Sequence, residues 1–216
     1  MLSTHKLAFS YRPDGVSIRF PELNLIRGEQ VALVGPSGSG KTTLANLIAG
    51  ILLPDAGHVR IDETEISSLS DSQRRDFRIA NVGFIFQEFE LVDYLNAEEN
   101  ILLPFLVNSS LQLDKNIRRR ARELAESTGL ADKLRRRPSQ LSQGEKQRLA
   151  ICRALITEPS LILADEPTGN LDSDTTSQIL ALIQAQARAR DATVLMITHD
   201  RSLLDQFDRV IDLGAE

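Results

Sequence analysis

A glycine-rich segment, GPSGSGKT, spans residues 35–42 of the 216-residue chain. It follows a short apolar run, VALVG, and precedes KTTLANLIAG, whose apolar residues recur at helical spacing. The pattern G-x-x-x-x-G-K-[ST] therefore lies between a predicted strand and a predicted helix, which is the context of a P-loop. Its glycines let backbone N–H groups point at phosphate oxygens, and the helix N-terminus adds partial positive charge. Lys41 can reach the β- and γ-phosphates of a nucleotide, and Thr42 offers a hydroxyl group to Mg²⁺.

Two consecutive carboxylates follow each other at the end of the apolar run LILAD, residues 161–165. Asp165 is expected at the C-terminal end of a strand, where α/β proteins bind ligands, and can hold Mg²⁺ there through water. Glu166 faces differently and can polarise an attacking water molecule as a general base. Together with the P-loop, this pair predicts phosphoryl transfer, which depends on positioning and charge stabilisation.

Two further side chains follow predicted strands at places where they can reach a phosphate. Gln87 comes directly after VGFIF and can coordinate Mg²⁺ or the attacking water. His199 comes directly after TVLMIT and can donate a hydrogen bond to the γ-phosphate. Taken alone, Gln87 is more typical of a surface glutamine, and a structural histidine is as frequent as a functional one at the end of a strand.

A second segment with anion-binding character, LSQGE, occupies residues 141–145 and precedes the helix-like run EKQRLAICRALI. We call it the signature segment. A small hydroxyl residue and a glycine at a helix start suit an anion, although the P-loop already provides one phosphate site. By itself the signature segment indicates either a second phosphate contact or only a helix N-cap.

The remaining patterns predict the elements that position these side chains. Residues 1–30 alternate like short antiparallel strands with a turn at PDG, and residues 58–62 return to strand character. Continuous apolar runs separated by helical segments predict a parallel sheet covered on both faces. These runs are residues 31–35, 82–86, 161–165, 193–198 and 209–213.

Residues 88–158 contain no convincing strand. We therefore expect one domain in which this stretch is a helical subdomain inserted into an α/β core made of residues 1–87 and 159–216. Within it, Asp114 is the expected N-cap of a helix that ends before Gly129.

Composition narrows the classes of function. The net charge of −5 argues against a protein whose main partner is nucleic acid. Basic clusters at residues 118–122 and 134–138 indicate either a solvated surface or a contact with a partner or a lipid headgroup. The single cysteine, Cys152, lies among apolar helix residues and is expected in the core. No segment has the ~20 apolar residues that span a bilayer and the N-terminus is not a secretion signal, so we expect a soluble chain.

Taken in order, GPSGSGKTT, Gln87, LSQGE, LILADEP, NLD (170–172) and His199 resemble the nucleotide-binding subunit of an ABC transporter. The resemblance covers essentially the entire chain. It implies an α/β P-loop ABC ATPase fold with a parallel core sheet, an N-terminal antiparallel β subdomain and an inserted helical subdomain. It also implies that the chain binds ATP and Mg²⁺ and hydrolyses the ATP.

The resemblance assigns a role to each matching position. Lys41, Gln87, Glu166 and His199 take catalytic roles, and Thr42, Gln87 and Asp165 hold the metal. Tyr11 stacks on adenine, and Asp172 belongs to a loop that couples two sites across a dimer. The family usually carries glycine where this chain has Gln143, and because that position tolerates other residues a working site is expected. The nucleotide contacts are Tyr11, Gly35, Pro36, Ser37, Gly38, Ser39, Gly40, Lys41, Thr42, Thr43, Ser142, Gln143, Gly144, Glu145 and Asp172.

In that family two chains meet head to tail, and the signature segment of one closes over the ATP in the P-loop of the other. The resemblance therefore implies an ATP-sandwiched homodimer that drives an integral membrane permease from the cytoplasmic face of the membrane. VGFIFQ, ENILLP, RPSQLSQGE and ADEPTGNLDS are similar to the branch that serves lipoprotein release, macrolide efflux and the bacterial cell-division complex.

Residues 95–108 are the expected docking site for the permease, or else they only pack the insert. Two other functions remain open: a soluble ABC-type ATPase that acts on nucleic acid or ribosomes, and a nucleotide-dependent scaffold of a cell-division complex.

Overall fold

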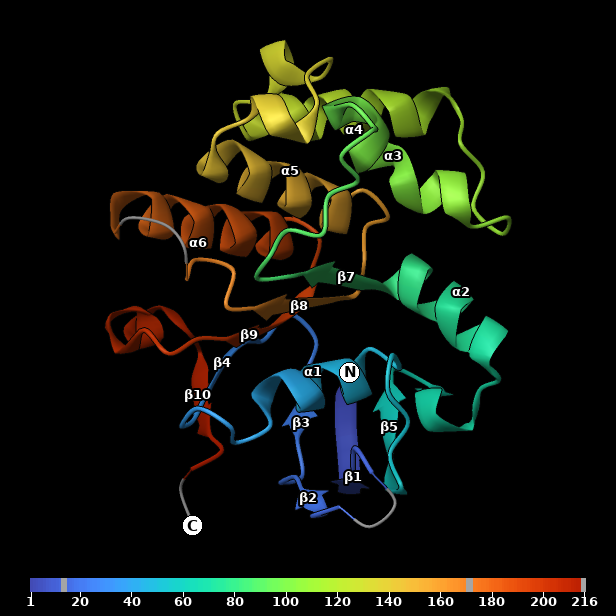
Figure 1. Ribbon diagram of the computed structural model, residues 1–216, viewed down its shortest axis with the longest axis vertical. Coiled ribbons are helices and arrows are strands. Elements are labelled where there is room, and N and C mark those ends of the chain that lie inside the picture. The colour runs from blue at the N-terminus through green and yellow to red at the C-terminus, as the bar shows by residue number, and fades with distance from the viewer. Residues whose placement is uncertain (13–14, 170–172, 215–216) are drawn as a thin grey trace.

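A computed structural model describes residues 1–12, 15–169 and 173–214 of the chain. Its elements form layers that are visible in Figure 1. Helices α3 (Ala97–Val107) and α4 (Lys115–Ser127) lie at one end of the molecule. A parallel sheet lies in the middle, and an antiparallel sheet that contains the N-terminal strand lies at the other end.

The central sheet has five parallel strands in the order β10-β4-β9-β8-β7. These strands are β4 (Gln30–Val34), β7 (Val82–Ile85), β8 (Leu161–Asp165), β9 (Thr193–Ile197) and β10 (Arg209–Asp212). All five runs predicted as parallel strands therefore form this sheet. The predicted α/β fold with a parallel core sheet is confirmed.

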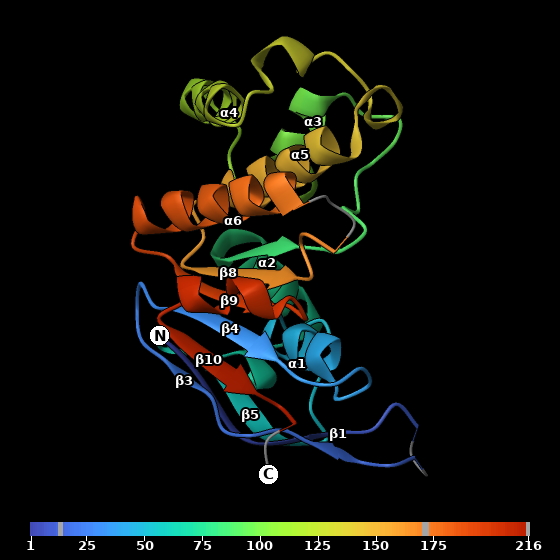
Figure 2. The same cartoon turned by 90° about the vertical axis from the view of Figure 1, so that its left-hand side faces the viewer.

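Both faces of the central sheet are covered, because side chains alternate along each strand. Ile162 and Ala164 of β8 pack in one apolar cluster with helices α5 (Gln143–Leu155) and α6 (Ser173–Arg188). Leu161 and Leu163 face the opposite way, into a cluster with helix α1 (Lys41–Ile48) and the antiparallel sheet. Figure 2 shows α6 lying between α5 and the strands β8 and β9.

The antiparallel sheet is built around β1 (Leu2–Phe9), which pairs with three other strands. Its remaining strands are β2 (Ile18–Arg19), β3 (Asn24–Leu25), β5 (Ala56–Ile61) and β6 (Thr64–Glu65). The strand predicted at 58–62 is thus β5, and it pairs with β1 outside the parallel sheet. Its own residues do not determine this choice, because sheet membership depends on a distant partner. Part of the predicted PDG turn lies outside the described residues.

Residues 88–158 are helical and contain no strand, as predicted. The side chain of Asp114 accepts the N–H of Ile117 and caps α4, and Gly129 beyond its end has a φ of 70°. The helix expected from Glu145 begins instead at Gln143 as α5. One helix was not predicted: α2 (Asp71–Asn81), which starts with a reciprocal capping box between Ser70 and Gln73.

The inserted helices share an apolar core with the central sheet. Ile101 of α3 and Leu124 of α4 belong to the same cluster as Ile162 of β8. Cys152 of α5 lies in this cluster with no solvent exposure, and burial raises the pKa of its thiol to about 12. Its predicted place in the core is confirmed. Within the described part of the chain, no helix combines the length and the apolar character needed to cross a bilayer.

Candidate functional site

The predicted site residues meet at one edge of the central sheet. Because the strands are parallel, their C-terminal ends point to the same edge. The P-loop leaves the end of β4, Gln87 follows β7, and Asp165 ends β8. His199 follows β9. Residues that lie far apart in the sequence are therefore gathered within one region of the molecule.

The P-loop turns sharply into helix α1. Gly40 is the N-cap of α1 with a φ of 88°, a left-handed conformation that favours glycine. A Cβ atom at this position would lie 2.9 Å from the ring of Phe20, so any larger residue would displace that ring. The turn and the packing both require glycine, and they leave the first backbone N–H groups of α1 free for an anion.

Lys41 is held over the P-loop by the loop itself. Its Nζ atom donates hydrogen bonds of 2.9 Å to the carbonyl oxygens of Gly35 and Pro36. An ammonium group has three donors, so one remains for a phosphate oxygen. The two carbonyl contacts orient the charge before any nucleotide arrives.

Asp165 is a buried carboxylate hydrogen-bonded to the Thr42 side chain, with 7% of its surface exposed. Burial raises the pKa of Asp165, and the neighbouring Glu166 raises it further. A hydrogen bond from the Thr42 side chain and the charge of Lys41 act in the opposite direction. Two oxygen-bearing side chains, Thr42 and Asp165, thus lie together at a point where burial disfavours the charge of the carboxylate.

Glu166 and His199 form a pair beside these residues. The Oε2 atom of Glu166 lies 3.3 Å from Nδ1 of His199. Glu166 has a φ of 46°, and its N–H donates to the carbonyl oxygen of Ile197 at 3.0 Å, which ties the turn after β8 to β9. A left-handed backbone conformation is strained for a non-glycine residue, and here it occurs directly after the strand, at the residue whose side chain contacts the histidine.

Gln87 lies close to this pair although it comes from the other side of β8. A Cβ atom built on Gly169 would be 3.8 Å from Nε2 of Gln87 and 3.8 Å from Oε2 of Glu166. The amide and the carboxylate therefore flank the same glycine.

A cavity of about 540 Å³ lies above the P-loop. Its lining includes Tyr11, Lys41, Thr42, Glu166 and His199. The Tyr11 hydroxyl lies 2.8 Å from Oγ1 of Thr43, and the residue is 67% exposed, so aromatic surface is available beside the P-loop. Glu166 and His199 also line an adjoining cavity of about 480 Å³.

The signature segment does not reach this cavity in a single chain, because none of its residues is part of the lining. Ser142 is the N-cap of α5 and accepts the N–H of Glu145, whose carboxylate accepts the N–H of Ser142 at 2.7 Å. That backbone N–H lowers the pKa of Glu145. Ser142 and Gln143 are exposed. Asp172, the other residue expected at a dimer contact, lies outside the described residues.

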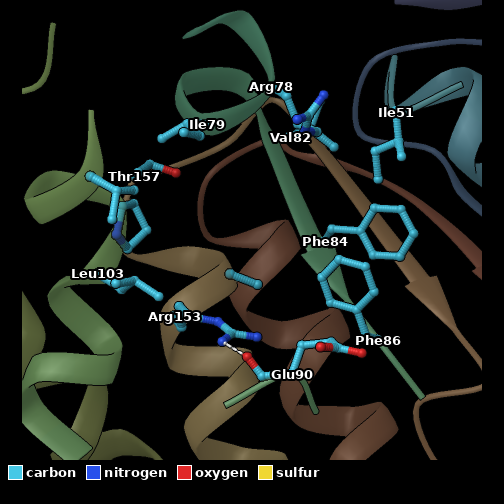
Figure 3. A pocket seen from close by; sticks show the side chains of 13 residues that line it. Ile51, Arg78, Ile79, Val82, Phe84, Phe86, Glu90, Leu103, Arg153 and Thr157 are labelled. Carbon is cyan, nitrogen blue, oxygen red and sulfur yellow. Dashed lines mark hydrogen bonds between the residues drawn. The ribbon is translucent and has the colours of Figure 1, made fainter. Parts of the chain in front are cut away.

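Sequence patterns did not predict an apolar groove of about 240 Å³ between α2, α3, α5 and β7 (Figure 3). We call it the docking groove; its lining comprises Ile51, Arg78, Ile79, Val82, Phe84, Phe86, Glu90, Leu103, Pro104, Val107, Arg153, Ala154 and Thr157. Two of these lining residues are arginines. One residue in the sequence could have indicated this groove. Arg153 is a charged residue within the apolar part of a helix, and a charged side chain in such a place is expected to be buried only with a polar partner.

These observations can be set beside known proteins. Residues 20–169 match the family described as ABC transporter. The chain belongs to the ABC transporter family.

Relatives of this ABC chain include ATP-binding proteins of lipoprotein-releasing systems. It is 43% identical to LolD of Colwellia psychrerythraea over 89% of this chain and 74% of the relative. It is 42% identical to LolD of Chromohalobacter salexigens over 99% of this chain and 90% of the relative. It is also 41% identical to the macrolide export protein MacB of Syntrophobacter fumaroxidans, over 90% of this chain but only 27% of that longer protein.

Among solved structures, the fold matches the ATP-binding cassette MJ0796 in a dimeric post-hydrolysis state bound to ADP and Pi. The TM-score is 0.89 at 35% identity, over 99% of this chain and 94% of that one. The ABC chain is therefore a nucleotide-binding, ATP-hydrolysing subunit of a membrane ABC transporter.

Proposed function

We propose that two copies of this ABC chain bind two ATP molecules between them and use hydrolysis to drive a permease that releases lipoproteins from a membrane. Each ATP lies in the P-loop of one copy and is capped by the signature segment of the other. The relatives named for lipoprotein release support the substrate class, because they match nearly the whole chain at more than 40% identity.

The observation that carries the sandwich is that the nucleotide cavity and the signature segment lie apart in one chain. Ser142 and Gln143 are exposed at the start of a capped helix, whose dipole favours an anion. A triphosphate in the P-loop would keep its γ-phosphate exposed unless a second positive helix end approached. A symmetric dimer supplies that helix end to both sites at once.

The site residues fit a bound Mg²⁺. Magnesium prefers oxygen ligands and is held in nucleotide sites by few carboxylates together with phosphates. Thr42 and Asp165 offer such oxygens, and the raised pKa of buried Asp165 marks a place where added positive charge is favourable. Gln87 is a further candidate ligand from the opposite side. A bound Mg²⁺ would neutralise charge on the phosphates.

The chain's own groups perform the remaining steps. Lys41 binds β- and γ-phosphate oxygens with its free donor, and Tyr11 stacks on the adenine ring. Glu166 accepts the proton of a water molecule that attacks the γ-phosphate, and the bond from the γ-phosphorus to the bridging oxygen breaks as ADP leaves. His199 donates a hydrogen bond to the γ-phosphate, and its contact with Glu166 holds both groups on one side of the cavity. Gln87 orients the water from the opposite side, next to Gly169.

We place the permease in the docking groove. Val107 is 63% exposed at the end of α3, and Ile51 is 44% exposed on the opposite wall, so the groove presents apolar surface to solvent. This assigns the predicted docking segment, residues 95–108, to one wall of a larger surface. A permease segment in the groove would hold the chain at the cytoplasmic face of the membrane.

Replacing Glu166 tests the proposal. Glu166→Gln keeps the size of the side chain but removes its basic carboxylate. The variant should bind ATP, form a stable dimer with ATP and Mg²⁺ in size-exclusion chromatography, and hydrolyse ATP at least about 100-fold more slowly. Glu126→Gln, at an exposed position of α4, is the matched control and should behave like the wild type. Undiminished hydrolysis or a strictly monomeric Glu166→Gln chain would refute the mechanism.

A further inference from the structure

Arg153 connects α5, here called the signature helix, to residues 87–90, here called the Gln87 segment. It lies in the last turn of α5, the helix that Ser142 caps at its other end. Its Nη2 atom donates to the carbonyl oxygen of Phe89 at 2.6 Å, and its Nη1 atom donates to the carbonyl oxygen of Glu90. Figure 3 shows the guanidinium group extending across the docking groove toward Glu90. A single side chain thus spans two elements that both serve the nucleotide.

The backbone that Arg153 holds is strained. Phe89 has a φ of 63° and Glu90 a φ of 49°, so two consecutive non-glycine residues adopt left-handed conformations. The segment is also held by hydrogen bonds from the N–H of Phe89 to Phe86 and from the N–H of Glu90 to Glu88. Strained conformations persist only where the surroundings hold them. Without the guanidinium the segment has fewer constraints and can relax.

The Arg153 guanidinium is largely removed from solvent, so its hydrogen bonds depend on the groups around it. Burial lowers the pKa of Arg153, and the charge of Glu90 partly offsets that effect. The carbonyl contacts replace the water that this charge has lost. Phe84 and Phe86 stack at a centroid distance of 4.2 Å beside it and form part of the same groove. Whatever fills the groove therefore touches the residues that surround the guanidinium.

We propose that Arg153 is a positioning residue for the ATP sandwich: it sets the orientation of the signature helix relative to the Gln87 segment. This inference rests on the proposed sandwich mechanism. Arg153 does not touch the nucleotide, because it is absent from the lining of the P-loop cavity. Its effect should appear in the assembly of the dimer and leave nucleotide binding to the P-loop unchanged.

Arg153→Lys tests the proposal in the Glu166→Gln chain. Lysine keeps the charge but lacks the fork that binds two carbonyl oxygens at once. The ATP dissociation constant of the monomer should change by less than about twofold, while the ATP-driven dimer should weaken about tenfold, as expected for one lost charge-assisted hydrogen bond. Amide hydrogen exchange in a peptide covering residues 86–92 should become faster in the monomer.

The matched control is Arg120→Lys in the same background. Arg120 donates to the carbonyl oxygen of Ile156 at 3.0 Å and pairs with Glu158, so it binds backbone just beyond the same end of α5 but does not contact the Gln87 segment. This variant should dimerise and exchange like its parent. The proposal would be overturned if the Arg153→Lys chain dimerised as strongly as its parent, or if the Arg120→Lys chain lost as much dimer as the Arg153→Lys chain. A loss of ATP affinity in the Arg153→Lys monomer as large as its loss of dimer would also overturn it. If the Glu166→Gln parent itself stays monomeric, the sandwich mechanism is what fails.

Discussion

Asp165 is a residue at which stability and function oppose each other. Its carboxylate is buried at the end of β8, and burial raises its pKa above the ordinary value of 3.8. The folded chain therefore binds this proton more tightly than the unfolded chain does. Between pH 3.8 and the raised pKa, the free energy of unfolding falls as the pH rises, and at neutral pH the full penalty is present.

Asp165→Asn should remove this penalty. The nucleotide-free variant should melt about 2–4 °C above the wild type at pH 7, the change expected for about 1 kcal/mol in a chain of this size. This difference should shrink as the pH is lowered through the raised pKa of Asp165 toward 3.8, because the wild-type carboxylate becomes protonated. Thermal unfolding followed by circular dichroism measures both effects, and ATP hydrolysis by the variant should be lost.

Asp132→Asn is the control for this effect. The pKa of the exposed Asp132 is lowered, mainly by its hydrogen bond with Lys133. The shift is opposite in direction to that of Asp165, so the Asp132→Asn chain should not be more stable than the wild type. A melting temperature of Asp165→Asn at or below that of the wild type at pH 7 would contradict the role of burial.

At the scale of elements, the N-terminus of α5 combines a structural and a binding role. The reciprocal bonds of Ser142 and Glu145 satisfy two backbone N–H groups. An N-cap of this kind contributes about 1 kcal/mol to the free energy of unfolding. The observed cap agrees with the simpler interpretation of the signature segment, yet the exposure of Ser142 leaves it accessible to a second chain.

Two substitutions separate these roles, because Asn and Asp both cap helices well. Ser142→Asn keeps the cap and stays neutral, so it should keep the ATP-driven dimer in the Glu166→Gln background. Ser142→Asp also keeps the cap but places a negative charge against the partner's γ-phosphate. It should abolish the dimer and leave monomer ATP affinity and melting temperature near those of the Asn variant.

Dimerisation is measured by size-exclusion chromatography with ATP and Mg²⁺. If Ser142→Asp chains still form the dimer, the signature segment does not contact the partner's nucleotide.

At the scale of the whole molecule, the docking groove lies between the central sheet and the inserted helices. Its walls come from β7, α2, α3 and α5, so a partner in it contacts both parts of the chain (Figures 1 and 3). Arg78 on one wall donates to the carbonyl oxygens of Ala49 and Gly50, just beyond the end of α1. The groove is thus in contact with the residues that directly follow α1 as well as with α5.

Val107→Gln should weaken the permease complex without changing the isolated chain. Burying an unpaired amide against an apolar partner is unfavourable and should reduce the amount of copurified permease about tenfold. ATP binding by the isolated variant should stay at the wild-type level. Val16→Gln is the matched control, because Val16 is 91% exposed and lies outside the groove lining. Copurification is quantified from detergent extracts, and equal recovery of permease with both variants would exclude this wall of the groove.

The sequence alone determined the elements whose signals are local. The P-loop, the five parallel strands, the cap at Asp114 and the stop at Gly129 are set by residues within a few positions of each other, so pattern and spacing predict them. Local patterns placed the start of α5 two residues too late and did not predict α2. Each of these helices follows a serine N-cap, and a serine is compatible with more than one starting residue for the helix after it.

Only the tertiary structure decided which distant residues meet. It paired β5 with β1, brought Gln87 and Glu166 close to the same glycine, Gly169, and joined Arg153 to the carbonyl oxygens of Phe89 and Glu90. It also separated the signature segment from the P-loop of the same chain. These contacts arise because burying apolar faces brings elements together across the chain, and the free energy of that packing belongs to the assembled core and to no single segment.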